Sequence, residues 1–449
     1  MKKKFLLINK KIKEFNYLIK SIPGDKSISI RVIILSSLAI GKSTIKNLPL
    51  SEDVQSATKC CKDLGVQIKR KKNITEIYGR GINGFVYKKN LVLNANNSGT
   101  VGRTILGAII RSPYKIKIVG DASLSKRDFS RIIAPLNEFG ATFYPKEKKK
   151  LPIYIKGTDF VRPIEWKNPI ASAQVNTAIA LGALNCPGES IIHSKPCRDH
   201  TQKLYKYLKI PIKIKKVKNY DLIKIKGLKN FNSFDYSIPS DPSSAAFFVM
   251  LTILSNKSSI LIKNCLINKY RIGFYKILKK MGAKIFFKNI KTYKGEKIAD
   301  IYCKSSKNLK SINLPKNFNN SSAIDEFISI FIISALKTKG TSIFKGLKEL
   351  NKKEAPRLDW GYKILKMIGI KAKKISNHGI KIYGNPKLKL NKKYVVKNYQ
   401  GDHRIAMNTI ILALAKGANF CIHDYNCINT SFPNFLKIIK SIGGKYEIN

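Results

Sequence analysis

The sequence repeats one pattern six times along its 449 residues. In each copy, a Gly-containing turn leads into a short strand, a polar loop, a helix, a second Gly-containing turn and another strand. The helices have apolar residues at helical spacing, and most are followed by Gly, which suits a helix C-terminus. The copies begin at Gly41, Tyr114, Gly188, Lys257, Gly340 and Gly417. The repetition predicts an assembly of six similar α/β units.

A second, more apolar helix is predicted before each repeat. The first turn of each of these helices is small or polar, and the following residues are apolar on almost every face, so we expect the helices to be buried. Asp, Asn and Ser at their starts are good N-caps. The helices begin near Asp25, Asn97, Ala171, Asp241, Ile324 and Asp402. Because a helix N-terminus attracts anions, six such starts with charged and polar neighbours predict an anion-binding pocket.

Two similar joints divide the six repeats into two groups of three. The stretches SIPGD, from Ser21, and YSIPSD, from Tyr236, both place Ile-Pro, a small residue and Asp before a buried helix. If the chain crosses between domains at both joints, residues 23–239 form the first domain and residues 1–22 plus 240–449 form the second. Two domains joined in this way could close over a substrate by a hinge motion.

The net charge of +58 has two interpretations. Charge this positive occurs in proteins that bind nucleic acid or anionic membranes. However, twelve of the 85 basic residues are Arg and the others are Lys, scattered along a chain also rich in Ile and Asn, which fits A/T-rich codons. No Arg cluster interleaved with aromatic residues indicates RNA binding. The Arg residues are more informative, because a guanidinium binds phosphate or carboxylate through two bonds.

Apolar runs and cysteines indicate the type of protein. No apolar run approaches the roughly 20 residues that a membrane span needs. The eight Cys contain no CxxC pair and no His at the spacing of metal ligands. This usage favours buried thiols in a reducing compartment over disulfides or a zinc site. We therefore expect a cytoplasmic protein without a membrane span.

A series of short motifs runs along the chain from PGDKSISIR at Pro23 to TSFPNF at Thr430, through NSGT, GDASLSKR, SAQV, RDHT, PSDPSSAAFF, IDE, KEAPR and GDHRIAM. Taken in order, these motifs resemble those of the 5-enolpyruvylshikimate-3-phosphate (EPSP) synthase family. The resemblance covers essentially the whole chain. It implies an α/β (α+β) fold, namely a two-domain inverse α/β barrel in which each domain has three βαβαββ repeats around buried helices. The active site is then expected in the cleft between the domains.

The resemblance also implies an activity. The family transfers the enolpyruvyl group of phosphoenolpyruvate to the 5-hydroxyl of shikimate 3-phosphate and releases phosphate, a step of the shikimate pathway toward chorismate and the aromatic amino acids. The first domain is expected mainly to bind shikimate 3-phosphate, and the second mainly to bind phosphoenolpyruvate and catalyse. No metal or organic cofactor is implied. The expected partners are the two small substrates, without nucleic acid or membrane, and the expected state is a monomer.

The family's motifs assign binding roles to residues of this chain. Both substrates carry a phosphate and a carboxylate, so several negative charges must be neutralised. The residues that match shikimate 3-phosphate ligands are Lys26, Ser27, Arg31, Ser172, Ala173, Gln174, Ser194, Arg198, Asp325 and Lys353. The residues that match phosphoenolpyruvate ligands are Lys26, Asn97, Gly99, Arg127, Gln174, Arg357 and Arg404.

The resemblance assigns the catalytic roles to Asp325, Glu354 and Lys26. The reaction must deliver a proton to the methylene carbon of phosphoenolpyruvate and remove another from the attacking hydroxyl. A carboxylate among cations is expected to be ionised and therefore able to accept a proton. The sequence does not decide which group protonates the methylene. His403 is expected to orient the loop before Arg404.

Four positions depart from the family's pattern. Ile30 stands where a polar residue is common, and Asp128 replaces a Pro next to Arg127. Asn351 replaces an Arg, and Pro356 replaces an Asp. We expect these changes to affect catalytic efficiency rather than the identity of the reaction.

Two other functions remain as alternatives. The sister enzyme that transfers enolpyruvyl to UDP-N-acetylglucosamine has the same fold, but it carries a reactive Cys in a Gly-rich loop, and none of the eight Cys lies in such a loop. A nonenzymatic polyanion- or RNA-binding protein on this fold would explain the charge. It would not explain why Asp325, Glu354, Lys26 and Arg127 are retained.

Overall fold

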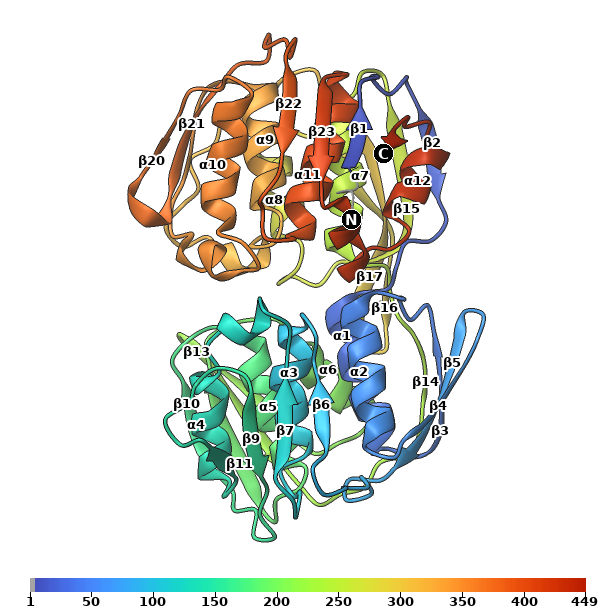
Figure 1. The fold of residues 1–449 in the computed structure, drawn as a ribbon, viewed down its shortest axis with the longest axis vertical. Helices are drawn as coiled ribbons and strands as arrows, with labels where there is room; N and C mark the ends of the chain where they lie inside the picture. The colour runs from blue at the N-terminus through green and yellow to red at the C-terminus, as the bar shows by residue number, and fades with distance from the viewer. Residues whose placement is uncertain (1–4) are drawn as a thin grey trace. The chain divides into compact units, whose positions relative to one another are not determined.

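The computed structural model describes residues 5–449, which form two compact units (Figure 1). Unit 1 contains the described residues up to Pro23, together with Ser240–Lys291 and Lys297–Asn449. Unit 2 contains Gly24–Pro239 and Thr292–Glu296. The short second segment of unit 2 is the tip of a hairpin, and it groups with unit 2 because Glu296 contacts a helix of that unit.

Each unit contains three four-stranded sheets of the same topology. In the simplest copy, β6 and β7 are parallel, and β9 pairs antiparallel with both β7 and β8, which gives the order β6-β7-β9-β8. A buried helix connects the two parallel strands, and an amphipathic helix leads to the antiparallel pair, so the copy reads βαβαββ. A crossover helix is what two adjacent parallel strands require.

The strands of unit 2 form the sheets β14-β3-β5-β4, β6-β7-β9-β8 and β10-β11-β13-β12. Their bounds are β3 (Ile40–Lys46), β4 (Gln67–Lys71), β5 (Ile74–Arg80), β6 (Val92–Asn94), β7 (Ile116–Val119), β8 (Thr142–Tyr144), β9 (Ile153–Lys156), β10 (Glu165–Asn168), β11 (Glu189–Ser194), β12 (Ile212–Val217), β13 (Tyr220–Lys226) and β14 (Asp235–Ser237).

The strands of unit 1 form the sheets β16-β17-β15-β2, β18-β19-β21-β20 and β22-β23-β1-β24. Their bounds are β1 (Phe5–Ile8), β2 (Asn16–Ile19), β15 (Ser259–Leu266), β16 (Ile285–Tyr293), β17 (Glu296–Lys304), β18 (Leu309–Lys310), β19 (Thr338–Phe344), β20 (Ala372–Lys374), β21 (Ile380–Gly384), β22 (Lys393–Val396), β23 (Asn419–His423) and β24 (Glu447–Ile448).

Three sheets are completed by strands from distant parts of the chain. β14, which comes last in unit 2, pairs in parallel with β3. In unit 1, β2 pairs in parallel with β15, and β1 lies antiparallel between β23 and β24. The N-terminal strands thus supply the positions that the repeats after Ser240 lack.

The helices are of the two predicted kinds. The mainly buried helices are α1 (Lys26–Leu38), α3 (Gly99–Ala108) and α5 (Ala173–Ala183) in unit 2, and α7 (Pro242–Leu254), α9 (Phe327–Lys337) and α11 (His403–Lys416) in unit 1. The amphipathic helices are α2 (Glu52–Asp63), α4 (Ser130–Glu138), α6 (His200–Tyr207), α8 (Gly273–Lys280), α10 (Arg357–Met367) and α12 (Phe435–Ser441). Short 3-10 helices are η1 (Leu124–Lys126), η2 (Asn320–Ser322), η3 (Lys348–Lys352), η4 (Ser376–His378) and η5 (Tyr425–Thr430).

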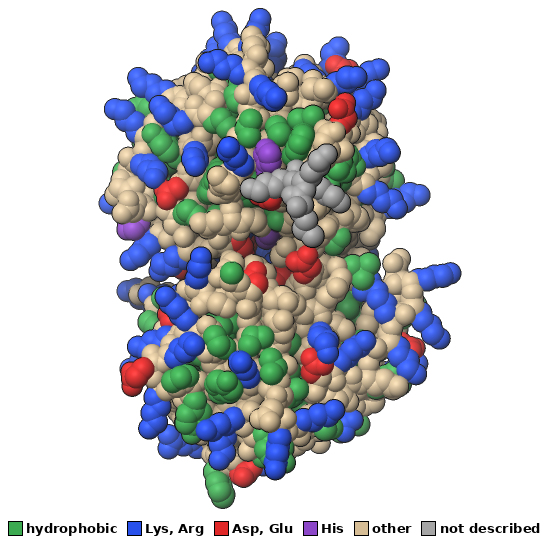
Figure 2. All heavy atoms as spheres, viewed as in Figure 1, with side chains coloured by type: hydrophobic (Ala, Val, Ile, Leu, Met, Phe, Trp, Pro, Cys, Tyr) green, Lys and Arg blue, Asp and Glu red, His purple; other side chains and the backbone are tan. Residues whose placement is uncertain are grey.

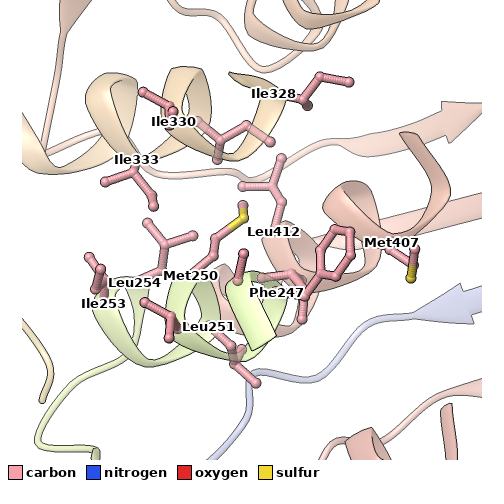
Figure 3. Close-up of a cluster of buried hydrophobic side chains, with 14 of the residues drawn as sticks. Phe247, Met250, Leu251, Ile253, Leu254, Ile328, Ile330, Ile333, Met407 and Leu412 are labelled. Atoms are coloured by element: carbon pink, nitrogen blue, oxygen red, sulfur yellow. The ribbon is translucent and has the colours of Figure 1, made fainter. Parts of the chain in front are cut away.

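The three buried helices of unit 1 pack on one another. In Figure 3, Met250 and Leu254 of α7 lie close to Ile330 and Ile333 of α9 and to Leu412 of α11. A helix that is apolar on all faces is stable only in such surroundings. Close packing of these apolar helices fixes where each one begins, and therefore where its polar first turn lies.

The starts of the buried helices follow the prediction except at α9. Asp25, Asp241 and Asp402 accept hydrogen bonds from backbone N–H groups of the first turn, with distances of 2.8 to 2.9 Å. Helix α9 begins at Phe327 and has no side-chain cap, so the predicted start near Ile324 was wrong. The Asp325 carboxylate, two residues before the helix, lies 3.2 Å from Arg357 Nη1.

The spread of charged side chains over the visible surface and the burial of the cysteines are as the sequence indicated. Figure 2 shows Lys and Arg side chains spread over the visible surface instead of gathered in one patch. Seven of the eight free cysteines are buried, and Cys427 is half-buried. Within residues 5–449, no helix has both the length and the apolar character that crossing a membrane requires.

Candidate active site

The start of α1 in unit 2 carries two of the predicted site residues, Lys26 and Ser27. Asp25 caps the helix, which fixes Lys26 and Ser27 in its first turn. The Lys26 ammonium lies 2.5 Å from the carboxylate of Asp53 on α2, which is almost fully buried. This ion pair orients the lysine, and Asp53 is a site residue that sequence reasoning missed.

Arg31, one turn farther along α1, donates hydrogen bonds to neutral oxygens. It is 3% exposed, so its guanidinium needs partners within the protein. Nε donates to Thr201 Oγ1 at 2.8 Å, and Nη2 donates to Thr177 Oγ1 at 2.8 Å. The carbonyl oxygens of Ser27 and Ala173 accept from Nη1 and Nη2 at 2.8 and 3.3 Å. Arg31 therefore ties together α1, α5 and α6.

Gln174, in the first turn of α5, is fixed at both ends of its side-chain amide. Its Oε1 accepts from Arg103 Nη1 at 2.8 Å, and its Nε2 donates to Thr100 Oγ1 at 3.1 Å. Both partners belong to α3. The starts of α3 and α5, far apart in the sequence, are thus joined through one predicted ligand.

Two guanidinium groups lie beside the start of α3. A Cβ placed on Gly99 would stand 3.2 Å from Nη1 of Arg103 and 3.2 Å from Nη1 of Arg127. Burial, followed by repulsion from Arg131 and Arg127, lowers the pKa of Arg103 to about 10. Cations that destabilise one another beside a helix N-terminus favour an anion at this place.

The departure at Asp128 does not place a carboxylate against Arg127. The Asp128 carboxylate accepts hydrogen bonds from the N–H and the hydroxyl of Ser130, at 2.9 and 2.6 Å, at the start of α4. Although burial acts in the opposite direction, these bonds lower the pKa of Asp128. The Asp128 carboxylate thus stabilises the start of α4. The backbone oxygen of Asp128 accepts a hydrogen bond from Arg103 Nη2 at 3.1 Å.

The other predicted residues of unit 2 lie around these helix starts. Asn97 donates to Asp121 at 2.5 Å just before α3. Ser172 caps α5 by accepting from the Val175 N–H. Ser194 is 2% exposed, and its hydroxyl accepts from Asn176 at 2.6 Å, so in this structure it supports α5 from behind. Arg198 is half-buried and immediately precedes the segment that begins α6.

The predicted residues of unit 1 meet at one guanidinium. Arg357, at the start of α10, is 2% exposed. Its Nε lies 2.8 Å from Asp402, its Nη1 lies 3.2 Å from Asp325, and its Nη2 contacts Glu354. Burial alone would lower the pKa of Arg357, but the three carboxylates raise it above its ordinary value. Asp325 and Glu354, the two predicted catalytic carboxylates, therefore both contact the Arg357 guanidinium.

Lys353 and Arg404 complete the cluster in unit 1. The Lys353 ammonium lies 3.3 Å from Asp325. Arg404 Nη1 donates to the backbone oxygen of Asp325 at 3.1 Å and lies 3.4 Å from the carboxylate of Glu326. Burial raises the pKa of Glu326, and Arg404 partly opposes that effect. Three predicted cations thus surround the turn that carries Asp325.

The remaining departures have local structural explanations. The side-chain oxygen of Asn351 accepts from the Leu358 N–H at 2.9 Å, and Pro356 is the residue that precedes α10, so both define the start of that helix. Ile30 is fully buried in the core of unit 2, where an apolar side chain is stabilising. None of these three residues, Asn351, Pro356 and Ile30, takes the place of a side chain in the contacts described above between the predicted site residues.

One group among residues 5–449 has the residue types of a metal site. Asp199, His200 and Glu296 offer ligand atoms within 4.8 Å of one another. The Glu296 carboxylate is already paired, at 2.6 Å with His200 Nδ1 and at 2.8 Å with the Lys203 ammonium. Against the effect of burial, these two partners lower the pKa of Glu296 to about 2. The geometry is that of an ion-pair network which fixes the hairpin tip to α6.

Sequence reasoning missed the residues that hold the site residues in place. Asp53, Arg103 and Thr177 lie outside the recognised motifs, Thr201 ends the RDHT motif without having been assigned a role, and their partners are up to 170 residues away. The one available signal was that Arg103 is one of twelve Arg in a chain in which most basic residues are Lys. Tertiary packing, which single-sequence patterns do not contain, determines these pairs.

Comparisons with known proteins agree on one family. The family model of EPSP synthase (3-phosphoshikimate 1-carboxyvinyltransferase) matches residues 11–439. The chain is 35% identical over 431 residues to the 3-phosphoshikimate 1-carboxyvinyltransferase of Zymomonas mobilis, which covers 95% of this chain and 94% of that protein. It is 38% identical over 424 residues to the protein of the same name from Ruthia magnifica, covering 94% of each.

A solved structure is similar over the full length. The structure of EPSP synthase from Acinetobacter baumannii has a TM-score of 0.87 and 31% sequence identity, covering all of both chains. At this similarity the repeats, the sheets and the buried helices of the two proteins correspond. The predicted two-domain inverse α/β barrel architecture is confirmed.

Proposed function

Because the chain belongs to the EPSP synthase family and transfers the enolpyruvyl group of phosphoenolpyruvate to shikimate 3-phosphate, we propose that its two clusters of charged residues act together on these substrates. The observation that carries the proposal is Arg357, which contacts both Asp325 and Glu354. Two carboxylates and a guanidinium in contact supply the proton-transfer groups and the anion ligand that the reaction needs.

We assign shikimate 3-phosphate mainly to unit 2. Lys26, Ser27 and Arg31 on α1 and Ser172 to Gln174 on α5 provide hydroxyls, an amide and cations at two helix starts. The neutral oxygens that accept from Arg31 hold its guanidinium and bring no negative charge of their own. A phosphate or carboxylate at this place would be stabilised by the guanidinium and by the helix N-termini. Arg198 and Ser194 remain predicted ligands, as do Asp325 and Lys353 from unit 1.

We assign phosphoenolpyruvate to Arg357 and Arg404 in unit 1, with Asn97, Gly99 and Arg127 of unit 2 acting on the same molecule. A substrate anion that binds the Nη groups of Arg357 competes with the carboxylates that already contact them. Glu354, which lies at the Nη2 edge and is half-buried, is the partner that can leave most readily. Substrate binding would then release Glu354 from its ion pair at the moment when a proton-transfer group is required.

The proposed chemistry uses three groups. Asp325 and Glu354 are the carboxylates that exchange protons with the 5-hydroxyl and with the methylene carbon, although their order of action is not assigned. Lys26, oriented by Asp53, supplies positive charge for both anionic substrates. Stabilising charge that develops in the transition state is the largest single contribution in many enzymes.

The wider expectations from the sequence stay predictions. These are that the protein is a cytoplasmic monomer, binds no nucleic acid and uses no metal or organic cofactor. The eight free cysteines suit a reducing compartment. The family comparison does not favour transfer to UDP-N-acetylglucosamine or a nonenzymatic polyanion-binding role.

The test is an assay of phosphate release from the full chain. Release is expected with phosphoenolpyruvate and shikimate 3-phosphate together, and not when UDP-N-acetylglucosamine replaces the latter as acceptor. Lys26→Met should lower turnover by about a hundredfold or more. If the folded protein releases no phosphate with both substrates present, the proposed function is wrong.

A further inference from the structure

Arg103 lies outside every motif of the sequence and yet contacts three parts of unit 2. From α3, its Nη1 donates to Gln174 at 2.8 Å and its Nη2 donates to the backbone oxygen of Asp128 at 3.1 Å. Its guanidinium carbon lies 5.2 Å from the centre of the Phe129 ring, a cation–π distance. Arg103 is therefore held in one position by contacts on several sides.

The chemistry of a guanidinium determines which end of the Gln174 amide faces it. A side-chain amide has a carbonyl oxygen that accepts and an NH2 group that donates, and the two ends have nearly the same shape. Arginine has donors and no acceptor. Arg103 therefore selects the rotamer in which the Gln174 oxygen faces Nη1, because the reverse rotamer would place two donors together.

Thr100 secures the other end of the amide. The Gln174 Nε2 donates one hydrogen to Thr100 Oγ1 at 3.1 Å. Nε2 carries a second hydrogen, for which residues 5–449 provide no acceptor, and Gln174 is only half-buried. One N–H group at the start of α5 is thus left to donate to a molecule outside the protein.

We propose that Arg103 is a positioning residue that fixes the polarity of the Gln174 amide, so that Gln174 presents a hydrogen-bond donor to an acceptor oxygen of the bound substrate. This inference rests on the proposed function, in which Gln174 is a ligand of the anionic substrates. It assigns the chemical class of the contacted atom: a hydroxyl, carboxylate or phosphate oxygen that accepts. Arg103 itself need not touch the substrate.

The same side chain links Gln174 to the proposed phosphoenolpyruvate clamp. Arg127, Asp128 and Phe129 are consecutive, and Arg103 contacts the last two of them. A displacement of Arg103 would therefore move the segment that carries Arg127 as well as the amide. For this reason the test must separate the effect on the amide from the effect on the segment.

The experiment measures the dissociation constant of shikimate 3-phosphate by calorimetry for a matched pair of variants. Arg103→Met removes the donors, frees the amide to rotate and should weaken binding by about tenfold, as the loss of one oriented hydrogen bond would. Arg103→Lys keeps one donor for the Gln174 oxygen and should stay within about threefold of the wild type. Thr100→Val and Thr100→Ser form a second pair, because only Ser keeps the acceptor for Nε2.

A double-mutant cycle distinguishes positioning from a structural role. In a Gln174→Ala background, Arg103→Met should change the dissociation constant by less than about twofold, because there is no amide left to orient. Equal effects of Arg103→Met in both backgrounds would overturn the proposal, as would unchanged affinity in the single variant.

Melting temperatures identify variants that fail to fold. In that case the Thr100 pair decides, since equal affinities of its Val and Ser variants would overturn the proposal. Absence of phosphate release by the wild type would instead refute the proposed function.

Discussion

The two clusters of the proposed site hold their arginines in opposite ways. In unit 2, Arg31 donates to two threonine hydroxyls and two backbone oxygens, which carry no charge of their own. In unit 1, Arg357 is surrounded by three carboxylates, which more than balance its charge. Both side chains are almost fully buried.

This difference indicates a division of labour. A buried cation that is held through neutral oxygens is prepared to receive an anion, because those oxygens do not cancel its charge. A buried cation that contacts several carboxylates holds those carboxylates close together, which suits proton transfer. We therefore expect variants of the residues around Arg357 to affect turnover and stability, and variants of the residues around Arg31 to affect substrate affinity.

The largest expected effect is on turnover. Glu354→Gln and Asp325→Asn keep the size of each side chain and remove its ability to accept a proton. Each should lower kcat by about a hundredfold to ten-thousandfold, which is the usual contribution of a general acid or base. Phosphate release at saturating substrate measures the effect. Glu349→Gln, in which a half-exposed carboxylate paired with Lys352 is neutralised, is the matched control and should leave kcat within about twofold.

The next effect is on stability and contrasts the two arginines directly. Arg357→Met leaves three carboxylates without their shared cation, and breaking a buried ion pair in this way costs about 3 to 5 kcal/mol. Arg31→Met leaves neutral oxygens unpaired, which costs about 1 to 3 kcal/mol. Denaturant unfolding of both variants measures the difference. A larger loss for Arg31→Met would contradict the comparison.

A smaller effect is expected on the affinity of unit 2 for shikimate 3-phosphate. Thr177→Val and Thr201→Val each remove one neutral acceptor from Arg31 while keeping the shape of the side chain. Each should weaken binding by about threefold to tenfold, since a misplaced guanidinium loses part of one charge-assisted hydrogen bond. Thr→Ser at the same positions keeps the hydroxyl and should restore affinity. If the Val and Ser variants bind equally, Arg31 is not positioned through these hydroxyls.

The smallest expected effect is on KM, and it differs between the two substrates. A methyl group at Gly99 would lie 3.2 Å from Arg103 Nη1 and from Arg127 Nη1, so both guanidiniums must shift by a few tenths of an ångström. Gly99→Ala should therefore raise KM for phosphoenolpyruvate several-fold, by about 1 kcal/mol, while KM for shikimate 3-phosphate changes little. Steady-state kinetics with each substrate varied in turn would show it. A selective rise in KM for shikimate 3-phosphate would contradict the assignment of Gly99 and Arg127 to phosphoenolpyruvate.

The sequence was sufficient for the parts of the fold that depend on local periodicity. The six repeats, the six buried helices and their polar starts follow from apolar spacing and from caps such as Asp25 and Asp402. The start of α9 was missed because an Asp before an apolar run looks like a cap. Asp325 instead forms ion pairs with Arg357 and Lys353, and the helix begins two residues later.

Supporting residues were beyond the reach of the sequence. The pair of Lys26 and Asp53 and the pair of Arg103 and Gln174 each connect two different helices. Such pairs depend on how the helices pack, and packing has no signature in a single sequence. Asp128 was interpreted as a carboxylate next to a substrate-binding Arg, whereas its carboxylate accepts hydrogen bonds from Ser130 at the start of α4.

The most direct test of the divided roles is the affinity for shikimate 3-phosphate of two matched variants, Arg31→Lys in unit 2 and Arg357→Lys in unit 1. Lysine keeps the charge but cannot reproduce the fork of a guanidinium. Arg31→Lys is predicted to weaken binding by about tenfold or more, whereas Arg357→Lys is predicted to bind within about threefold of the wild type. Equal losses in the two variants, or a greater loss for Arg357→Lys, would contradict the account.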